Sequence, residues 1–547
     1  MLTHPVALTL IAVLVAAALA ARAVPLRWAS AVESALGHRL TPWVIGLGTA
    51  LACWWVAGAT FHVEPISTDE AAYLLQARIF AAGHLTAPAP PIPDFFAQAW
   101  VVVTPRLFAK YPPGTSLVLV PGLWLGLPWL VPCLLDLVSG ALLFTLLRRA
   151  IGAPAALVTW AAWVLSGMTM QWQTGYFSEV PLLACWLGSV ACAWRWIDGG
   201  RRRWLLVAAA CAGFGALTRP LSILLLGLPL AVAVWRSARR SARWRDVGMA
   251  TLVAVGFVLT IPPWNAATTG HPLRSPLREY TEDYLPWDRV GFAIDSTAPL
   301  LPTPPDLEGI APQLARVHRE HTLARLPRTL FERALWVSGQ LFTHWRPALA
   351  LLALVGIWRL GGAAWVGLWA ALAEFLGHAV WGHQAGWTLY YAEGAAAWYV
   401  PGAVGLVAVV GWLVRRTRPD TEAAPRAALA AVVLLPLLLW LSVAGSRGYR
   451  EWRTRRAADS RAFTEMVAAG PGHAIYFVRY GTPAAGRPAL IRNDPWLAGA
   501  RDWIVYDLGP RNDELLRLAP DRAAFLVDVA ARRVTPLREA PPPATPR

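Results

Sequence analysis

The stretch LVPCLLDLVSGALLFTLLRR at residues 130–149 is an apolar run that ends in two arginines. In a helix, about 20 such residues cross ~30 Å of hydrocarbon, and arginines beside a span favour the cytoplasmic side. Similar runs recur, and we count twelve, beginning near residues 5, 43, 130, 154, 179, 204, 220, 248, 346, 363, 398 and 427. The sequence therefore predicts an all-α polytopic membrane protein with about 12 transmembrane helices.

The composition agrees with this class. Hydrophobic residues make up 56% of the 547 residues, charged residues only 15%, and the mean hydropathy is +0.43. The net charge of +16 comes mainly from arginines in short clusters between apolar runs, which argues for membrane anchoring and against nucleic-acid binding. The five cysteines all lie inside apolar runs and indicate neither a disulfide framework nor a zinc site.

The arginine clusters also predict the orientation. The positive-inside rule is satisfied if the cytoplasm holds the clusters within residues 22–39, 148–149, 201–203, 236–245 and 415–418. Both termini are then extracytoplasmic, in what we expect to be a bacterial plasma (inner) membrane. No Lys or Arg precedes the first run, so we expect it to remain as an uncleaved span.

Three long segments then lie outside, and chemistry is expected there. Residues 62–129 and 265–345 form two loops of a transmembrane module that extends over residues 1–445, and the second loop, rich in proline, is interpreted as a partly ordered lid or wall. Residues 446–547 alternate between helix-like and strand-like patterns and predict a small extracytoplasmic α/β domain. Its proline-rich end, residues 540–547, is expected to be disordered.

The first outer loop contains the only lysine of the chain, Lys110, directly before Tyr111, Pro112, Pro113 and Gly114. An ammonium group is a compact point charge suited to phosphate, so this lysine is a candidate countercharge. The alternative is a chance survivor beside an interfacial tyrosine and a stiff turn that orients the following apolar helix.

The same loop begins with Ser67-Thr68-Asp69-Glu70, directly after the second span. A carboxylate at this depth can act as a general base, and Asp69 is our first choice, with Glu70 as its companion. Ser67 and Glu70 also have the spacing of a capping box, which would give the acids a purely structural role. A divalent metal held by Asp69 and Glu70 is a further alternative, although adjacent helical residues point about 100° apart.

Charged residues of later spans are expected on the same side. Arg219 ends the segment Gly215-Ala216-Leu217-Thr218-Arg219-Pro220 and, with Lys110, could form a phosphate clamp. It could equally be a snorkelling or ion-paired arginine. Glu179 starts a span and could face the cavity near Asp69 or simply favour the helix dipole. His378 and His383 are expected to be interface or bundle residues rather than metal ligands.

Together these motifs resemble the GT-C membrane glycosyltransferases, among them the protein O-mannosyltransferases and the lipid A aminoarabinose transferase. The resemblance rests on Asp69-Glu70 with Tyr73, on the Lys110 motif, on the Arg219-Pro220 junction, on residues 265–270, and on Tyr390-Tyr391-Ala392-Glu393. The resemblance extends over roughly residues 40–410. Each motif alone is short, and the order, spacing and common side of the membrane of all the motifs make the resemblance specific.

The resemblance implies a sugar donor on a polyprenyl phosphate or pyrophosphate, inverting transfer on the outer face, and Asp69 as the base. Lys110, Tyr111, Arg219, Glu179, Tyr391 and Glu393 are then candidate substrate-binding residues, the partners are the donor, the bilayer and a glycan, lipid or protein acceptor, and no cofactor is certain.

Two other functions fit the same sequence. A transporter or flippase for lipid-linked sugars would also have about twelve spans, but charges within its spans are expected to mark the pathway, and here only Asp136, Arg195 and Glu374 are candidates. A relative that binds lipid-linked sugar without turnover is the remaining alternative.

Overall fold

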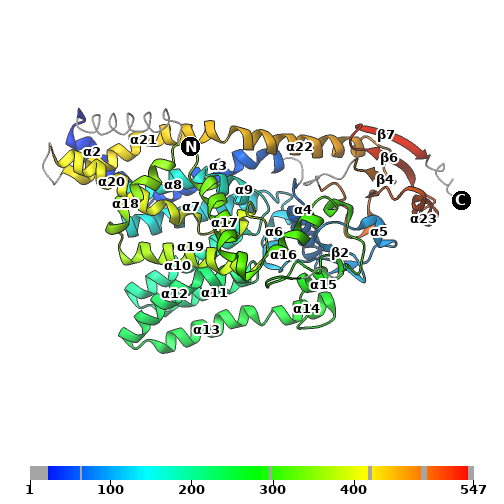
Figure 1. Cartoon of the computed structure of the whole chain (residues 1–547), viewed down its shortest axis with the longest axis horizontal. Helices are drawn as coiled ribbons and strands as arrows, with labels where there is room; N and C mark the ends of the chain where they lie inside the picture. The colour runs from blue at the N-terminus through cyan, green and yellow to red at the C-terminus, as the bar shows by residue number, and fades with distance from the viewer. Residues whose placement is uncertain (1–22, 62–64, 295–297, 417–421, 482–488, 540–547) are drawn as a thin grey trace.

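The computed structural model describes residues 23–61, 65–294, 298–416, 422–481 and 489–539 of the chain. The span predicted near residue 5 and the tail at residues 540–547 lie outside these residues. Most of the described chain is helical, and Figure 1 shows a bundle of helices on one side and a small β-sheet at the opposite end.

Seven apolar segments of the described chain are long enough to cross a membrane. They are α7 (Leu130–Ile151), α10 (Glu179–Gly199), α12 (Pro220–Ser241), α13 with α14 (Trp244–Val258 and Ile261–Thr269), α19 with η4 (Gly362–Gly377 and His378–Val380), η6 with α20 (Ala395–Tyr399 and Val400–Arg415) and α21 (Ala423–Gly445). An eighth results if α2 (Leu26–Gly37) and α3 (Thr41–Phe61), which are bent by 75°, are counted as one span.

The other predicted spans are helices of smaller length. α8 (Ala153–Val164), α11 (Arg202–Ala216) and α18 (Pro347–Gly356), the last continued by η3 (Ile357–Arg359), begin close to their predicted positions with 12, 15 and 10 residues. α8 is buried along most of its length inside the bundle, so its uniformly apolar sequence indicates burial by protein as well as by lipid. The chain is thus a multi-pass membrane protein, while the predicted total of 12 spans is not established.

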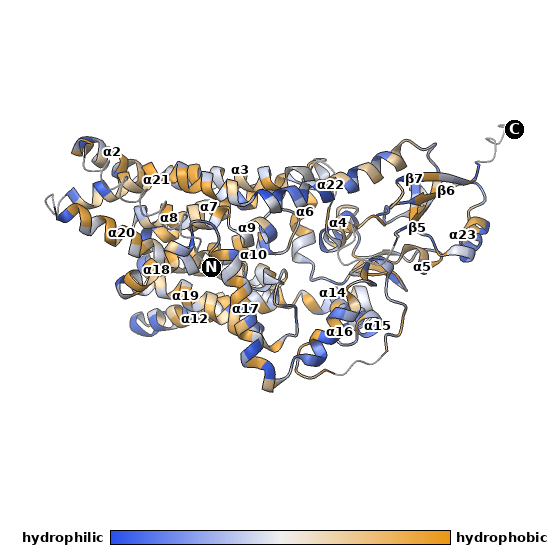
Figure 2. Ribbon diagram, turned by 45° about the horizontal axis from the view of Figure 1, so that its top comes forward, coloured by the Kyte–Doolittle hydropathy of each residue, from blue (hydrophilic) through white to orange (hydrophobic). Residues whose placement is uncertain are grey.

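Small residues allow close helix packing in the bundle. α18 packs against α20, where an added Cβ at Gly405 would overlap the carbonyl oxygen of Leu352 and one at Gly356 would overlap that of Pro401. Close backbone approach at glycine is a common means of association between helices in membranes. Figure 2 shows hydrophobic colouring along α20 and α21, and hydrophilic patches on α16 and α22.

The first outer loop builds a compact layer from short elements. α4 (Thr68–Ala81) packs against α6 (Gly114–Trp124). In the sequence between these two helices lie α5 (Pro93–Phe96) and a three-stranded antiparallel sheet. The strands are β1 (Ala87–Pro88), β2 (Val101–Val102) and β3 (Arg106–Ala109), in the order β1-β3-β2.

The second outer loop is more helical than its lack of periodicity predicts. It contains α15 (Pro276–Tyr284), η1 (Pro305–Leu307), α16 (Ala311–Glu320), η2 (Leu323–Arg325) and α17 (Leu326–Leu341). Its buried side chains Tyr280, Leu307 and Leu314 share one hydrophobic core with Trp100 and Phe108 of the first loop. The two outer loops therefore form one body.

The residues after α21 continue as α22 (Arg447–Ala468), which Figure 1 shows running on from α21 towards the sheet. The sheet has the order β5-β4-β6-β7. β5 and β6 are both parallel to β4, and β7 is antiparallel to β6. Its strands are β4 (Ala474–Arg479), β5 (Asp502–Tyr506), β6 (Ala523–Asp528) and β7 (Arg533–Arg538), with η8 (Leu497–Gly499), η9 (Gly509–Arg511) and α23 (Asn512–Leu518) between them. The edge strand β7 was not predicted.

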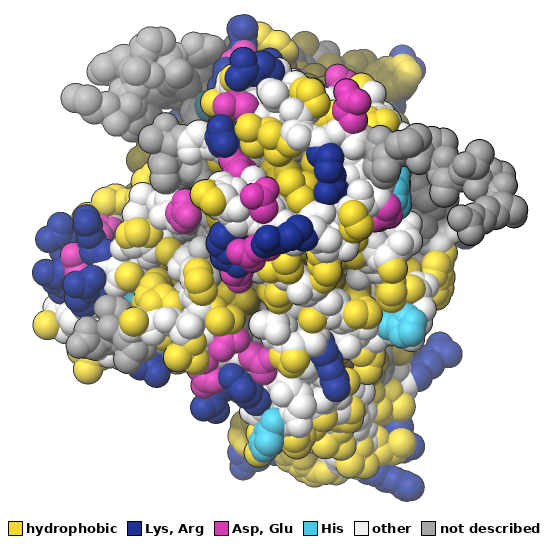
Figure 3. Space-filling model, turned by 90° about the vertical axis from the view of Figure 1, so that its right-hand side faces the viewer, with side chains coloured by type: hydrophobic (Ala, Val, Ile, Leu, Met, Phe, Trp, Pro, Cys, Tyr) yellow, Lys and Arg dark blue, Asp and Glu magenta, His cyan; other side chains and the backbone are white. Residues whose placement is uncertain are grey.

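The sheet is attached to the first outer loop by α5. The Phe95 ring meets Phe477 edge to face at 6.2 Å, and Arg511 pairs with Asp94 at 2.9 Å. Figure 3 shows this end of the molecule with basic and acidic side chains interspersed among hydrophobic ones.

The close contact between α18 and α20 gives a stability prediction. Gly405→Ala is expected to lower the free energy of unfolding by ~2 kcal/mol, because the new methyl group has no room beside Leu352. Gly256→Ala in α13, where nothing lies within 4 Å of the added Cβ, is the matched control and is expected to leave stability unchanged or raise it. Thermal unfolding in detergent measures both, and equal melting temperatures would contradict the packing.

Candidate functional site

Asp69 lies in the first turn of α4, at the start of the first outer loop. The hydroxyl of Tyr111 donates a hydrogen bond to Asp69 Oδ1 at 2.5 Å, and the Asp69 side chain is only partly buried. Asp69 is therefore an oriented carboxylate with one oxygen left to face a ligand.

Glu70, its neighbour, is placed differently. It is fully buried, and its Oε2 accepts hydrogen bonds from the backbone and hydroxyl of Ser67 at 3.2 and 3.0 Å, while Oε1 accepts from the Tyr176 N–H at 3.1 Å. Ser67 in turn caps the Glu70 N–H, so both halves of the capping box are present. The geometry gives Glu70 the structural role that the sequence left open, and joins α4 to the turn before α10.

Tyr111 connects Asp69 to a second tyrosine. Its ring stacks on Tyr73 with centroids 4.4 Å apart, and both side chains belong to one hydrophobic cluster. Burial, together with the charge of Asp69, raises the pKa of Tyr111 well above its ordinary value. The Tyr111 hydroxyl therefore stays protonated and is a permanent donor to Asp69.

Lys110 is buried beside this pair. Its Nζ lies 3.8 Å from the centroid of the Trp100 ring and 3.9 Å from Asp288 Oδ2. Burial lowers the pKa of Lys110, and the charges of Asp288 and Asp69 oppose that shift. The lysine is thus an enclosed cation between two carboxylates and an aromatic face.

The Pro-Pro-Gly turn after Lys110 fixes the first loop to the membrane bundle. The Gly114 N–H donates to the carbonyl oxygen of Leu217 at 2.7 Å. A Cβ at Gly114 would come within 2.6 Å of the Thr218 hydroxyl and 2.7 Å of Leu217, so only glycine fits without displacement. This contact brings the motif that contains Lys110 against the junction that contains Arg219.

Arg219 is ion-paired inside the protein. One terminal nitrogen donates to Glu179 Oε1 at 2.5 Å and to the Ser178 hydroxyl at 3.2 Å, and the other donates to the carbonyl oxygen of Leu389 at 3.2 Å. Its Nε lies 3.5 Å from Glu393 Oε1. Arg219, Glu179 and Glu393 thus form one buried group, and Arg219 is held by carboxylates, as in the ion-paired alternative, rather than turned outward beside Lys110.

Glu393 carries the least satisfied carboxylate of this group. It is 3% exposed, and neither of its side-chain oxygens has a hydrogen-bond partner within the described residues. Burial raises the pKa of Glu393, while the charge of Arg219 opposes the shift. Glu374 of α19 lies beside it and accepts a hydrogen bond from the Gly394 N–H at 3.0 Å. The site thus contains more buried acid than cation.

Tyr391 and Tyr390 point to different surroundings. The Tyr391 hydroxyl is bonded to His383 Nε2 at 2.9 Å, and its ring contacts Phe375, so it belongs to the bundle interior. Tyr390 instead places its ring 5.8 Å from the Arg219 guanidinium. In η5 (Thr388–Tyr391), adjacent side chains diverge, and the sequence alone did not show which tyrosine faces the charged group.

The sequence did not predict that three further residues would lie together around Lys110. Asp288, Trp100 and Tyr280 surround Lys110. Trp100 belongs to the first of the two long loops, whereas Asp288 lies in the second, an aperiodic and proline-rich loop that gave no signal for it. The pairing of the two outer loops brings them together.

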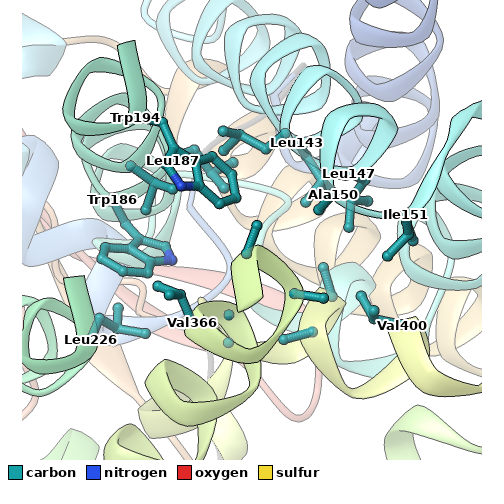
Figure 4. Close-up of a pocket in the computed structure, with 18 of the residues that line it drawn as sticks. Leu143, Leu147, Ala150, Ile151, Trp186, Leu187, Trp194, Leu226, Val366 and Val400 are labelled. Atoms are coloured by element: carbon teal, nitrogen blue, oxygen red, sulfur yellow. The ribbon is translucent and has the colours of Figure 1, made fainter. Parts of the chain in front are cut away.

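An apolar pocket opens inside the bundle and reaches the charged group. Glu393 and Gly394 line one part of it. Figure 4 shows the apolar side chains around it, which come from α7, α10, α12, α19 and α20 and include Leu143, Leu147, Trp186, Trp194, Leu226, Val366 and Val400. The apolar lining suits a hydrocarbon chain.

A metal site is not formed by Asp69 and Glu70. Asp69 is turned to Tyr111, whereas both oxygens of Glu70 serve Ser67 and Tyr176. Among the described residues, no group of three or more His, Cys, Asp or Glu side chains is arranged to hold a metal ion. These two acids therefore do not fit one shared ion in this arrangement.

The sequence and fold were compared with known proteins. A family model described as dolichyl-phosphate-mannose-protein mannosyltransferase matches residues 128–265, and no curated protein matches the chain. The structure of this chain is similar to that of ArnT from Cupriavidus metallidurans bound to undecaprenyl phosphate, with a TM-score of 0.50 and 15% identity. The match covers 90% of this chain and 94% of ArnT. Arabinosyltransferase EmbB from Mycobacterium smegmatis is also similar, with a TM-score of 0.41 and 14% identity over 82% and 44% of the respective chains.

The likeness to ArnT extends over nearly the whole of both chains. It confirms the GT-C fold that the order of sequence motifs predicts, in an integral multi-pass membrane protein. At this level of identity, the likeness describes the fold, and the roles of single residues rest on the geometry above.

The pairing of Arg219 gives a second stability prediction. Arg219→Gln leaves Glu179 and Glu393 buried without a cation and is expected to destabilise the protein by ~3 kcal/mol. Replacing Glu179 by Gln as well is expected to restore part of the loss. Arg278→Gln, at an exposed helical pair with Glu282, is the control and should change the melting temperature little. Equal effects of the two single variants would contradict a buried ion pair.

Proposed function

We propose that the chain is a membrane glycosyltransferase that transfers a sugar from a polyprenyl phosphate or pyrophosphate donor to an acceptor on the outer face, with inversion. The observation that carries the proposal is the cluster in which a half-buried carboxylate, Asp69, stands beside an enclosed ammonium, Lys110. The GT-C fold and the family-model match support the same activity. The solved ArnT structure contains undecaprenyl phosphate, which supports a polyprenyl carrier.

Asp69 is proposed as the general base. An acceptor hydroxyl attacks the anomeric carbon, the new carbon–oxygen bond forms as the bond to the phosphate oxygen breaks, and the proton of the hydroxyl passes to Asp69. The Tyr111 hydroxyl holds one carboxylate oxygen, which leaves the other free to receive that proton. We assign Glu70 the task of fixing α4, and thereby Asp69, rather than a proton transfer of its own.

Lys110 is proposed as the countercharge of the leaving group. Negative charge grows on the phosphate as the glycosidic bond breaks, and a cation already in place stabilises that state more than the ground state. Its burial strengthens the interaction, since little water screens it. Tyr111 and the Pro-Pro-Gly turn keep the lysine at the membrane boundary.

Arg219 is proposed as a second phosphate cation that exchanges partners. Because Glu179 and Glu393 neutralise it in the unliganded chain, a phosphate must compete with them for the guanidinium. The unsatisfied oxygens of Glu393 are then suited to accept hydrogen bonds from sugar hydroxyls. Tyr390 replaces Tyr391 as the proposed aromatic contact.

The apolar cavity is proposed to take part of the isoprenoid chain. It begins at Glu393, close to the cations, and continues between α7, α10 and α20 towards residues such as Ile151. A lipid whose phosphate lies near Lys110 and Arg219 can therefore place apolar carbons in protein rather than in water. We propose a location in the bacterial inner membrane, with the site on the extracytoplasmic face.

The proposed activity is tested with purified protein, a panel of labelled polyprenyl-phosphate sugars, and candidate glycan, lipid and peptide acceptors, with and without chelator. Release of the carrier phosphate together with labelled acceptor is expected for at least one donor. Movement of intact lipid-linked sugar across vesicles without cleavage would favour a transporter, and binding without either event would favour an inactive relative.

The role of Asp69 is tested in the same assay. Asp69→Asn should reduce kcat by about 100-fold or more, because the amide cannot accept the proton, while donor binding persists. Asp94→Asn, at an exposed acid of the same loop, is the control and should retain activity. Transfer at the unmodified rate in Asp69→Asn would remove this residue from the mechanism.

The role of Lys110 has its own test. Lys110→Ala should lower kcat and weaken donor binding, whereas Lys110→Arg should restore binding in part, since it keeps a charge of different shape. Unchanged kinetics in Lys110→Ala would show that the ammonium does not meet the leaving group.

A further inference from the structure

Lys110 is the only lysine of the chain, and its surroundings define how its charge is maintained. We propose that Asp288, in the second outer loop, is a positioning residue that holds the Lys110 ammonium against the Trp100 face and keeps it charged throughout the transfer. The inference rests on the proposed function, because it assigns Lys110 to the donor phosphate.

The geometry of the three side chains carries the proposal. Lys110 Nζ lies 3.8 Å from the Trp100 ring centroid and 3.9 Å from Asp288 Oδ2. The Lys110 and Asp288 side chains are 7% and 14% exposed, so water screens the pair only weakly. Tyr111 and Tyr280 present their rings at 5.4 and 5.3 Å from the same nitrogen. The cation is thus enclosed by aromatic faces on several sides and by one loop-borne carboxylate.

Trp100 is itself held in an uncommon conformation. Its backbone angle φ is 68°, in a region that residues other than glycine rarely adopt. The Trp100 N–H donates to the Tyr280 hydroxyl at 3.0 Å, its indole N–H donates to the Thr68 hydroxyl at 2.9 Å, and its carbonyl oxygen accepts from the Lys110 N–H at 2.9 Å. A strained residue fixed by three contacts is typical of a functional site.

Asp288 is fixed as firmly from its own side. Its N–H donates to the carbonyl oxygen of Leu285 at 2.8 Å, and His318 Nε2 lies 3.3 Å from its Oδ1. The Trp381 indole also bonds to the carboxylate, and residue 290 pairs with Trp381 in a β-bridge. Although burial raises it, these contacts and the charge of Lys110 keep the pKa of Asp288 below its ordinary value. The carboxylate is therefore an ionised group with a fixed position.

The two carboxylates that face Lys110, those of Asp69 and Asp288, differ in whether they keep their charge during the proposed reaction. Asp69 and Asp288 both raise the pKa of Lys110 against burial, whereas the tyrosines around it are neutral and His318 acts through Asp288. When Asp69 receives the acceptor proton, it becomes neutral and its support for the ammonium ends. Asp288 is not consumed in that step. It remains the internal countercharge of Lys110 at the moment when the departing phosphate needs the cation.

The pH dependence follows from the sign of this interaction. Removing Asp288 lowers the pKa of Lys110, so the ammonium is lost at a lower pH than in the unmodified chain. The change is expected on the alkaline side only, because Lys110 is fully charged at low pH in either case.

The single lysine makes a direct measurement available. Full-length protein labelled with [ε-¹³C]lysine in lipid nanodiscs should give one lysine side-chain resonance, whose chemical shift reports the charge of Lys110 as the pH is raised. We expect Asp288→Asn to move the midpoint down by about one pH unit or more, and Asp288→Glu to restore most of it. Asp283→Asn, at a carboxylate of α15, is the matched control and should leave the midpoint unchanged. If Asp288→Asn does not fold, Asp288→Ser replaces it.

A binding titration separates this inference from the proposed function. Undecaprenyl phosphate affinity should fall at alkaline pH in the unmodified chain and at lower pH in Asp288→Asn, and the difference between the two should vanish in a Lys110→Arg background, where the charge is permanent. An unshifted lysine midpoint in Asp288→Asn would overturn the inference, whatever the transfer assay shows. A shifted midpoint without undecaprenyl phosphate binding would sustain Asp288 as the countercharge and count against the donor class.

Discussion

The buried ion pair between Arg219 and Glu179 is the interaction on which the rest of the site depends. It joins the N-terminal ends of α10 and α12, and Glu393 brings the segment before α20 to the same point. The Leu217 carbonyl, two residues before the arginine, receives the Gly114 N–H and so fixes the first outer loop to this group. Desolvated charges tolerate little displacement, because a lost partner leaves a charge in a medium that does not solvate it. The bundle and the loop above it are therefore fixed to one another at a polar point rather than by apolar packing alone.

Two charge groups of similar balance lie side by side. Around Lys110, aromatic faces and two carboxylates enclose one cation, and around Arg219, three glutamates meet one guanidinium. Both groups hold more acid than base, which keeps the cations charged in spite of burial. An anionic ligand entering between them would replace protein carboxylates with its own oxygens.

The sequence predicted the fold more fully than the site. Apolar runs gave the helix positions, since hydropathy reports burial, but α8 and α18 are too short to cross alone, and apolar character does not distinguish lipid from protein surroundings. Asp69 and Lys110 were selected as candidate site residues because motif order placed them in one loop. The sequence analysis named Tyr391 as the candidate substrate-binding tyrosine, and the structure leads us to propose Tyr390 instead. The direction of a side chain in a short 3-10 turn depends on its backbone, which the sequence does not show. Asp288 was missed because it reaches Lys110 through the packing of two distant loops, and no local pattern records that contact.

α22 has a structural consequence. It continues from the end of α21 to the C-terminal sheet, and Arg453 in its interior donates to the carbonyl oxygen of Thr174 at 2.6 Å. The turn that follows Thr174 supplies the N–H that binds Glu70. α22 therefore connects the C-terminal sheet, through the turn that contains Thr174 and Tyr176, to Glu70 in the first turn of α4, which is also the turn that carries Asp69.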